Sequence, residues 1–178
     1  IGNLVNRNFN ISEPLLEAET DELRVSFIHE SVTNTGISVA VRKTPAVRRL
    51  TEKRMLDSGY ADELMIKLLE ALIKGHCSII VTGDVGSGKT ELVKYLTKYI
   101  PDNERTISIE DSFELRLAAI NPELDCVEMK ASEGFDYTSC IKSSLRQLCR
   151  WLLLSESRSR EVASLLEAAS TGCTRLTP

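Results

Sequence analysis

Apolar and polar residues alternate along two short stretches near the start of the chain. Apolar side chains occupy every second position of residues 23–27 and again of residues 37–41. A period of two is typical of β-strands with one apolar face, and the sequence NTG at residues 34–36 is a turn signal. We therefore predict a β-hairpin. Residues 1–20 are polar and weakly patterned, and we interpret them as an irregular lead-in or as the end of an earlier domain.

A helical pattern replaces the alternation further along the chain. Thr44-Pro45 breaks the strand pattern, and the charged residues 47–59 predict a short helix. From Ala61 to Lys74 the residues Leu64, Leu68 and Leu72 recur at helical spacing, which predicts an amphipathic helix that ends at Gly75.

After Gly75, short apolar runs alternate with helical segments. The predicted strands are residues 78–82, 106–109, 126–129 and 151–154. The predicted helices are residues 88–100, 137–148 and 162–169. Strands that alternate with helices indicate an α/β fold, in which helices cover both faces of a mostly parallel sheet.

These patterns divide the chain of 178 residues into three parts. Residues 1–44 are interpreted as the C-terminal part of a small α+β N-terminal domain, and residues 45–58 as a linker. Residues 59–178 form the predicted α/β domain.

The overall charge limits the classes of partner. The chain is 42% hydrophobic and 27% charged, with a net charge of −4. This composition is typical of a soluble globular protein, and the acidic balance argues against direct binding of nucleic acid. A basic run is interpreted as a solvated face beside the linker, with a local basic patch as the alternative. The basic run consists of Arg42, Lys43, Arg48, Arg49, Lys53 and Arg54.

The cysteines and histidines do not predict a disulfide framework or a metal centre. The chain has five cysteines, an odd number, and none of them forms a CxxC pair. This pattern favours thiols over disulfides or a zinc site. His29 and His76 are far apart in sequence and have no ligand partner at metal spacing.

The strongest chemical signal is a phosphate-binding loop. Residues 83–90, GDVGSGKT, match the pattern GxxxxGK[ST] between a predicted strand and a predicted helix. Glycines let backbone N–H groups point inward around phosphate oxygens, and the helix N-terminus adds positive potential. Lys89 would contact the β- and γ-phosphates, and the Thr90 hydroxyl would bind Mg²⁺. The residues assigned to nucleotide binding are Gly83, Val85, Gly86, Ser87, Gly88, Lys89, Thr90 and Glu91.

Acidic residues follow two of the predicted strands. Glu110 and Asp111 come directly after residues 106–109, and Glu156 follows residues 151–154 after one residue. The carboxyl ends of parallel strands surround the ligand crevice, so these acids are expected to face the phosphates. Hydrolysis needs an acid that polarises water and a group that binds Mg²⁺. Ordinary loop carboxylates are the alternative interpretation.

Four segments of the chain follow one another in a recognisable order. They are GDVGSGKT, SIEDSFEL at residues 108–115, LRQLCRWLLLSESRSREV at residues 145–162 and AASTGC at residues 168–173. They resemble the Walker A motif, the aspartate box, the Walker B region and the start of the histidine box of the type II/IV secretion ATPases, the traffic ATPases of secretion, conjugation and pilus machines. The resemblance is to the branch of conjugation-type and tight-adherence pilus ATPases.

The resemblance implies a RecA-like P-loop NTPase domain with specific catalytic roles. Glu110 would polarise water with Asp111 beside it, and Glu156 would be the Walker B glutamate. Thr90, Glu156 and Asp111 are then the candidate Mg²⁺ ligands. Arg24 and Arg42, from the N-terminal domain, would reach the γ-phosphate.

The resemblance also implies a function. It predicts a homo-hexameric ATPase that uses ATP and Mg²⁺ to power protein secretion or pilus assembly. Such a protein lies in the cytoplasm, at the inner face of the cytoplasmic membrane, and acts on an inner-membrane platform protein. The alternatives are a non-hydrolysing nucleotide-binding assembly module, or another P-loop class such as a nucleic-acid translocase or a small-molecule kinase.

The sequence also departs from the family pattern. Ser155 replaces the usual glycine before Glu156, Cys149-Arg150 stands where Pro-Asp is common, and Cys173 replaces the histidine of the histidine box. The family continues beyond Pro178, so the ATPase domain is expected to be truncated at its C-terminus. These departures concern hydrolysis more than nucleotide binding, because the P-loop is complete.

Overall fold

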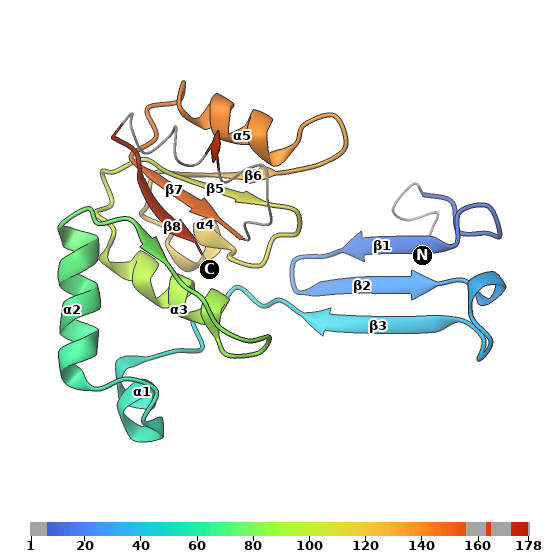
Figure 1. Ribbon diagram of the computed structural model, residues 1–178, viewed down its shortest axis with the longest axis horizontal. Coiled ribbons are helices and arrows are strands. Elements are labelled where there is room, and N and C mark those ends of the chain that lie inside the picture. The colour runs from blue at the N-terminus through green and yellow to red at the C-terminus, as the bar shows by residue number, and fades with distance from the viewer. Residues whose placement is uncertain (1–6, 156–162, 165–171, 178) are drawn as a thin grey trace. The chain divides into compact units, whose positions relative to one another are not determined.

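The computed structural model describes residues 7–155, 163–164 and 172–177. The chain forms two compact units, Ile1–Pro45 and Ala46–Pro178 (Figure 1). Two predicted features lie largely or wholly outside the described residues. They are the helix at residues 162–169, of which Ala163 and Ser164 are helical, and the candidate catalytic residue Glu156.

The first unit is a three-stranded antiparallel sheet. Its strands are β1 (Leu15–Glu19), β2 (Leu23–Ile28) and β3 (Ser38–Lys43), in the order β1-β2-β3, and the 3-10 helix η2 (Glu30–Val32) follows β2. The pairing of β2 with β3 confirms the predicted hairpin. The sequence analysis missed β1, because Glu and Ala are poor strand formers and only pairing with β2 makes this segment extended.

The second unit begins earlier than predicted. Helix α1 (Glu52–Ser58) starts at the N-cap Thr51, whose side chain accepts a hydrogen bond from the Arg54 N–H. Met55 in this helix is fully buried, and Leu50 packs against the same apolar cluster. Most of the segment predicted as a linker is therefore part of the second unit. The many charged residues of this segment hid the two apolar positions that face the core.

The second unit is built around a five-stranded sheet, in which every pairing of the described strands is parallel. The strand order is β4-β8-β7-β5-β6. The strands are β4 (Ile79–Ile80), β5 (Thr106–Glu110), β6 (Cys126–Lys130), β7 (Trp151–Leu154) and β8 (Thr174–Thr177). The parallel sheet confirms the predicted α/β class. β8 was not predicted, since its short polar sequence is a strand only because it lies between β4 and β7.

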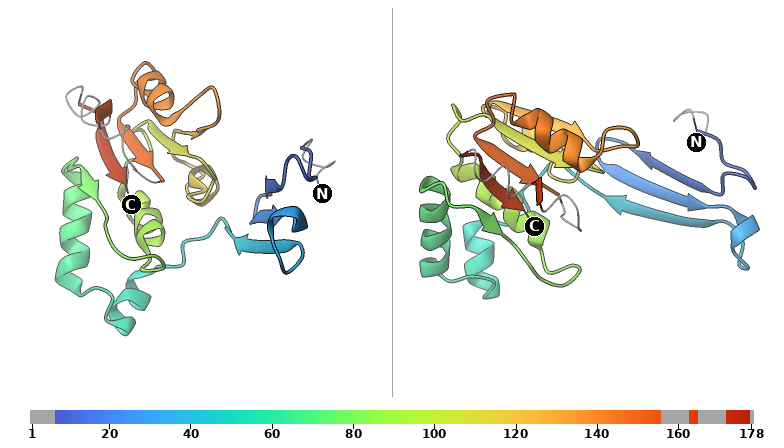
Figure 2. Two further views of the ribbon diagram at one scale, coloured as in Figure 1. Left: turned by 45° about the vertical axis from the view of Figure 1, so that its right-hand side comes forward. Right: turned by 45° about the horizontal axis from the view of Figure 1, so that its top comes forward.

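Helices cover both faces of this sheet (Figure 2). The helices that follow α1 are α2 (Glu63–Lys74), α3 (Lys89–Leu96), α4 (Leu117–Ile120) and α5 (Tyr137–Ser144). One apolar cluster joins α1, α2 and α3 to Trp151 and Leu153, and a second joins α5 to Leu152 and Leu154. Successive residues of β7 therefore point to opposite faces, so the whole strand is buried.

Two helices end earlier than predicted. α3 ends at Leu96 and continues as the 3-10 helix η3 (Thr97–Tyr99). α5 ends at Ser144, and Leu148, the last residue of the predicted helix, is 88% exposed. Leu148 has φ 56°, a left-handed conformation that does not continue a helix.

Candidate functional site

The P-loop connects β4 to the N-terminus of α3, at the carboxyl end of the strand. Gly86 and Gly88 have φ values of 80° and 92°, in the left-handed region where a Cβ atom is unfavourable. The Ser87 N–H donates to the Asp84 carbonyl at 3.2 Å, and the Leu92 N–H donates to the Gly88 carbonyl at 2.8 Å. The loop thus curls tightly and leads directly into the first turn of α3.

The Lys89 side chain folds back over this loop. Its Nζ donates to the carbonyls of Gly83 at 2.8 Å and Asp84 at 2.9 Å. The ammonium therefore lies within the curl of the backbone, next to the helix N-terminus. Phosphate oxygens are chemically suitable replacements for these two carbonyl acceptors, so the donor set matches a bound nucleotide phosphate.

Glu91, which was assigned to nucleotide binding, has partners within the protein instead. Its Oε2 accepts a hydrogen bond from the Arg49 N–H at 3.2 Å, and its Oε1 lies 3.9 Å from Lys94 Nζ. These contacts connect α3 to the segment before α1. In this structure Glu91 stabilises the position of α3 beside the segment that precedes α1.

Tyr60 is a neighbour of the P-loop that the sequence analysis did not identify. A Cβ atom added at Gly88 would lie 3.6 Å from the Tyr60 hydroxyl oxygen. The Tyr60 ring thus packs beside the last glycine of the loop. No sequence pattern distinguishes this tyrosine, because the contact depends on the turn after α1.

The Glu110 carboxyl lies in the interior, which does not match its expected contact with water. Glu110 is fully buried at the carboxyl end of β5, and its Oε2 accepts hydrogen bonds from the N–H groups of Glu114 at 2.8 Å and Leu115 at 3.0 Å. Burial raises the pKa of Glu110 to about 7. As the structure stands, Glu110 stabilises the loop that follows β5 and has no surface from which to polarise water.

The adjacent Asp111 is half-buried and belongs to a small polar network at the carboxyl ends of β5 and β7. The Tyr137 hydroxyl accepts a hydrogen bond from the Asp111 N–H at 3.0 Å and forms another with the Ser155 hydroxyl at 2.9 Å. The Ser155 N–H also donates to the Ile109 carbonyl at 3.1 Å. Ser155, which replaces the usual glycine, is thus connected to the aspartate box through Tyr137. The sequence indicated Tyr137 only as a core position.

Arg24 and Arg42 lie directly opposite each other on β2 and β3. The Arg24 guanidinium is 3.7 Å from Glu17 Oε1 on the same face of the sheet. Both arginines belong to the first unit, whereas the P-loop belongs to the second. The structure therefore places the two candidate arginines side by side within the first unit.

Arg48 is half-buried and hydrogen-bonded within the protein, whereas the basic run was expected to be solvated. Its Nε donates to the Lys94 carbonyl at 3.1 Å, and its Nη2 contacts Thr97 and Asn121. Burial lowers the pKa of Arg48. The guanidinium thus provides a hydrogen-bond donor to a carbonyl near the C-terminal end of α3, where the helix dipole favours a cation.

Replacing Arg48 by alanine is expected to lower the free energy of unfolding by about 2 kcal/mol, the usual contribution of charged hydrogen bonds that lose one partner. Urea denaturation would measure the change. Lys53→Ala, an exposed substitution on α1, is the control and should have little effect. Equal effects of the two substitutions would contradict a structural role for Arg48.

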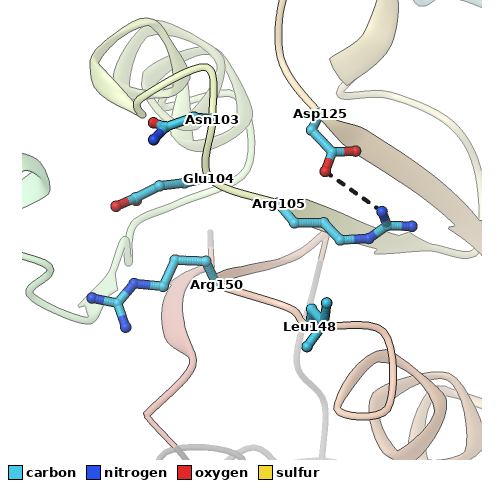
Figure 3. A pocket seen from close by; sticks show the side chains of 6 residues that line it. All are labelled: Asn103, Glu104, Arg105, Asp125, Leu148 and Arg150. Atoms are coloured by element: carbon cyan, nitrogen blue, oxygen red, sulfur yellow. Dashed lines mark hydrogen bonds and ion pairs between the residues drawn. The ribbon is translucent and has the colours of Figure 1, made fainter.

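A cavity of about 360 Å³ lies at the amino edge of the sheet, opposite the edge that carries the P-loop (Figure 3). It is formed by residues just before β5, β6 and β7, and is lined by Asn103, Glu104, Arg105, Asp125, Leu148 and Arg150. Arg105 points toward Asp125 and forms an ion pair at 3.5 Å. Because parallel strands place their nucleotide site at their carboxyl ends, this cavity is separate from the P-loop.

Comparisons with known proteins show the family of this chain. The family model described as "Type II/IV secretion system protein" matches residues 14–178. The type IV secretion system protein VirB11 of Bartonella quintana is 35% identical over 109 residues, which cover 58% of this chain and 30% of that protein. The chain spans only 25–38% of the length of the first three curated relatives that it matches.

Two solved structures share the fold. The Legionella pneumophila ATPase DotB has a TM-score of 0.68 at 19% identity, covering 94% of this chain and 47% of that one. The VirB11 ATPase of the Brucella suis type IV secretion system has a TM-score of 0.58 at 24% identity, covering 99% and 58% of the two chains. With the family match over almost the whole chain, the conclusion is that this protein belongs to the type II/IV secretion system protein family.

Proposed function

We propose that this chain is part of an ATPase that hydrolyses Mg-ATP to power protein secretion or pilus assembly. The observation that supports this most directly is the complete P-loop at the carboxyl edge of a parallel sheet, with the Lys89 ammonium inside it. The relatives named as secretion-system proteins and secretion ATPases support the same assignment.

The residues present suit ATP and Mg²⁺. Lys89 and the backbone N–H groups of the loop would bind the phosphates, and Thr90, Asp111 and Glu156 would supply oxygen ligands to Mg²⁺. When bound, Mg²⁺ neutralises charge on the phosphate oxygens. Glu156 would position the attacking water, while Arg24 and Arg42 would approach the γ-phosphate from the first unit.

The assembly in which this would happen is part of the same proposal. The ATPase would act as a homo-hexamer at the cytoplasmic face of the inner membrane, against a platform protein of a secretion or pilus machine. In the described part of the chain, no helix combines the length and the apolar character needed to cross a bilayer.

A non-hydrolysing nucleotide-binding module is the second candidate. The full burial of Glu110 favours it, because this carboxyl does not face water as it stands. Steady-state Mg-ATP hydrolysis by the chain and by Glu156→Gln would separate the two functions. The ATPase proposal expects turnover that Glu156→Gln abolishes while ATP still binds. Binding without turnover in the unmodified chain would favour the second function, and stimulation by DNA would favour a translocase.

Tyr137→Phe is expected to lower kcat about fivefold and to leave the dissociation constant for ATP unchanged. The substitution removes the two hydrogen bonds by which the hydroxyl connects the Asp111 N–H to Ser155, a loss of about 1 kcal/mol at about 0.5 kcal/mol each. Ser155→Ala removes one of these two bonds. The double variant should therefore be little worse than Tyr137→Phe alone. Additive losses in kcat would contradict the proposed connection.

A further inference from the structure

Two cysteines approach each other at the amino edge of the sheet, far along the chain from the P-loop. Cys149 Sγ and Cys173 Sγ are 3.0 Å apart. Cys149 lies two residues before β7, and Cys173 lies immediately before β8. The strands themselves are paired in parallel, and the Thr174 N–H donates to the Arg150 carbonyl at 2.8 Å. The backbone thus keeps the two sulfur atoms side by side.

This separation is close to what a disulfide requires. A disulfide bond is about 2.05 Å long and needs Cα atoms no more than about 7 Å apart. The sulfur atoms would have to approach by about a further 1 Å to form the bond. Among the described residues, no group of three potential metal ligands includes the pair.

Cys149 is half-buried, whereas Cys173 is buried, so a small reagent would reach Cys149 first. Its chain neighbours Leu148 and Arg150 line the cavity of about 360 Å³. The hydrogen bond with Cys173 and burial raise the pKa of the Cys149 thiol, and the charge of Arg105 acts in the opposite direction. Arg105 is paired with Asp125, and Arg150 is the other cation of the cavity, which a small reagent bearing carboxylates would approach.

We propose that Cys149 and Cys173 form a modification site, closed to a disulfide by a small anionic disulfide of the glutathione class. The Cys149 thiolate attacks one sulfur of oxidised glutathione, which gives a mixed disulfide and releases one glutathione. Cys173 then attacks the Cys149 sulfur and releases the second glutathione. Two protein thiols are oxidised to one disulfide, one glutathione disulfide is reduced to two thiols, and the two protein protons end on these thiols.

The bond would connect the starts of two adjacent strands. It would also close residues 149–173 into a loop, and this loop contains Glu156. Cross-linking restricts the unfolded chain, so the oxidised protein should unfold at a higher temperature. Nucleotide binding should be unchanged, because the cysteines lie at the edge opposite the P-loop.

The test is to incubate the purified chain with oxidised glutathione and to map its sulfur chemistry by mass spectrometry. The proposal expects two of the five thiols to be lost, the peptides containing Cys149 and Cys173 to be linked, and the melting temperature to rise. Dithiothreitol should reverse both changes. Cys149→Ser and Cys173→Ser should each prevent the link, whereas Cys77→Ser, at an exposed cysteine, should leave it intact.

Two results would overturn the proposal. One is the persistence of all five thiols under conditions that oxidise a reference dithiol. The other is glutathione that stays attached to Cys149 with no closure to Cys173. Both are measured on the unmodified chain, so neither depends on whether a serine variant folds.

Discussion

Replacing Lys89 by alanine is expected to raise the dissociation constant for Mg-ATP about a hundredfold, which corresponds to about 2.7 kcal/mol. The Lys89 ammonium already lies within the P-loop, where it donates to two backbone carbonyls. Bound phosphates would take over these hydrogen bonds as stronger, charge-assisted acceptors. Isothermal titration calorimetry with a slowly hydrolysed ATP analogue measures the change without interference from turnover.

A matched control separates this role from a general loss of positive charge. Lys67 on α2 is exposed and forms a surface ion pair with Glu63, so Lys67→Ala removes the same charge away from the loop. It should bind nucleotide like the unmodified chain. If Lys89→Ala retained normal affinity, the P-loop would not be the nucleotide site, and the proposed function would fail with it.

Glu110→Gln is expected to raise the free energy of unfolding by about 3 kcal/mol more at pH 8 than it does at acid pH. The pKa of the buried Glu110 is raised from its ordinary value of 4.5 to about 7. Each unit of pKa shift corresponds to about 1.4 kcal/mol. Above pH 7 the folded protein must keep a charged carboxylate in its interior, a cost that glutamine does not have.

The sign of the pH dependence follows from proton uptake. Between pH 4.5 and about 7, the folded chain binds the Glu110 proton more tightly than the unfolded chain does. The stability that Glu110 contributes is therefore fully present below pH 4.5 and is lost as the pH rises through 7. Urea denaturation of both proteins at several pH values should show their difference growing over this range.

Glu123→Gln is the control for that experiment, because Glu123 is exposed and its substitution should not change the pH profile. A difference between Glu110→Gln and the unmodified chain that stays constant from pH 4.5 to pH 8 would contradict the raised pKa. Glutamine can still accept the hydrogen bonds from Glu114 and Leu115, so the loop after β5 keeps its contacts.

The sequence by itself determined the elements whose signals are local. The P-loop was predictable because its glycines, its lysine and its threonine all lie within eight consecutive residues. β7 was predictable because a strand buried on both faces is a continuous apolar run. β5 and β6 were predictable because apolar residues alternate with polar ones along them. The hairpin of β2 and β3 followed from alternation with a turn between the strands. From these local signals came the α/β class and the phosphate site.

Only the tertiary structure decided the elements and contacts that depend on distant partners. β1 and β8 have weak intrinsic strand preference and are extended because neighbouring strands pair with them. Met55 is buried because α1 packs against the core of the second unit, a contact that could not be predicted from its mostly charged sequence.

The same reason separates what was and was not predictable in the candidate site. Position after a strand suggested that Glu110 faces the ligand, but strand alternation and the following loop direct its carboxyl into the interior. Tyr137 connects Asp111 to Ser155 from a helix 26 residues beyond Asp111. Cys149 and Cys173 lie side by side only because β7 and β8 pair in parallel. A sequence pattern indicates the face of a helix or strand on which a residue lies. The distant residue that contacts it is determined only by the tertiary fold.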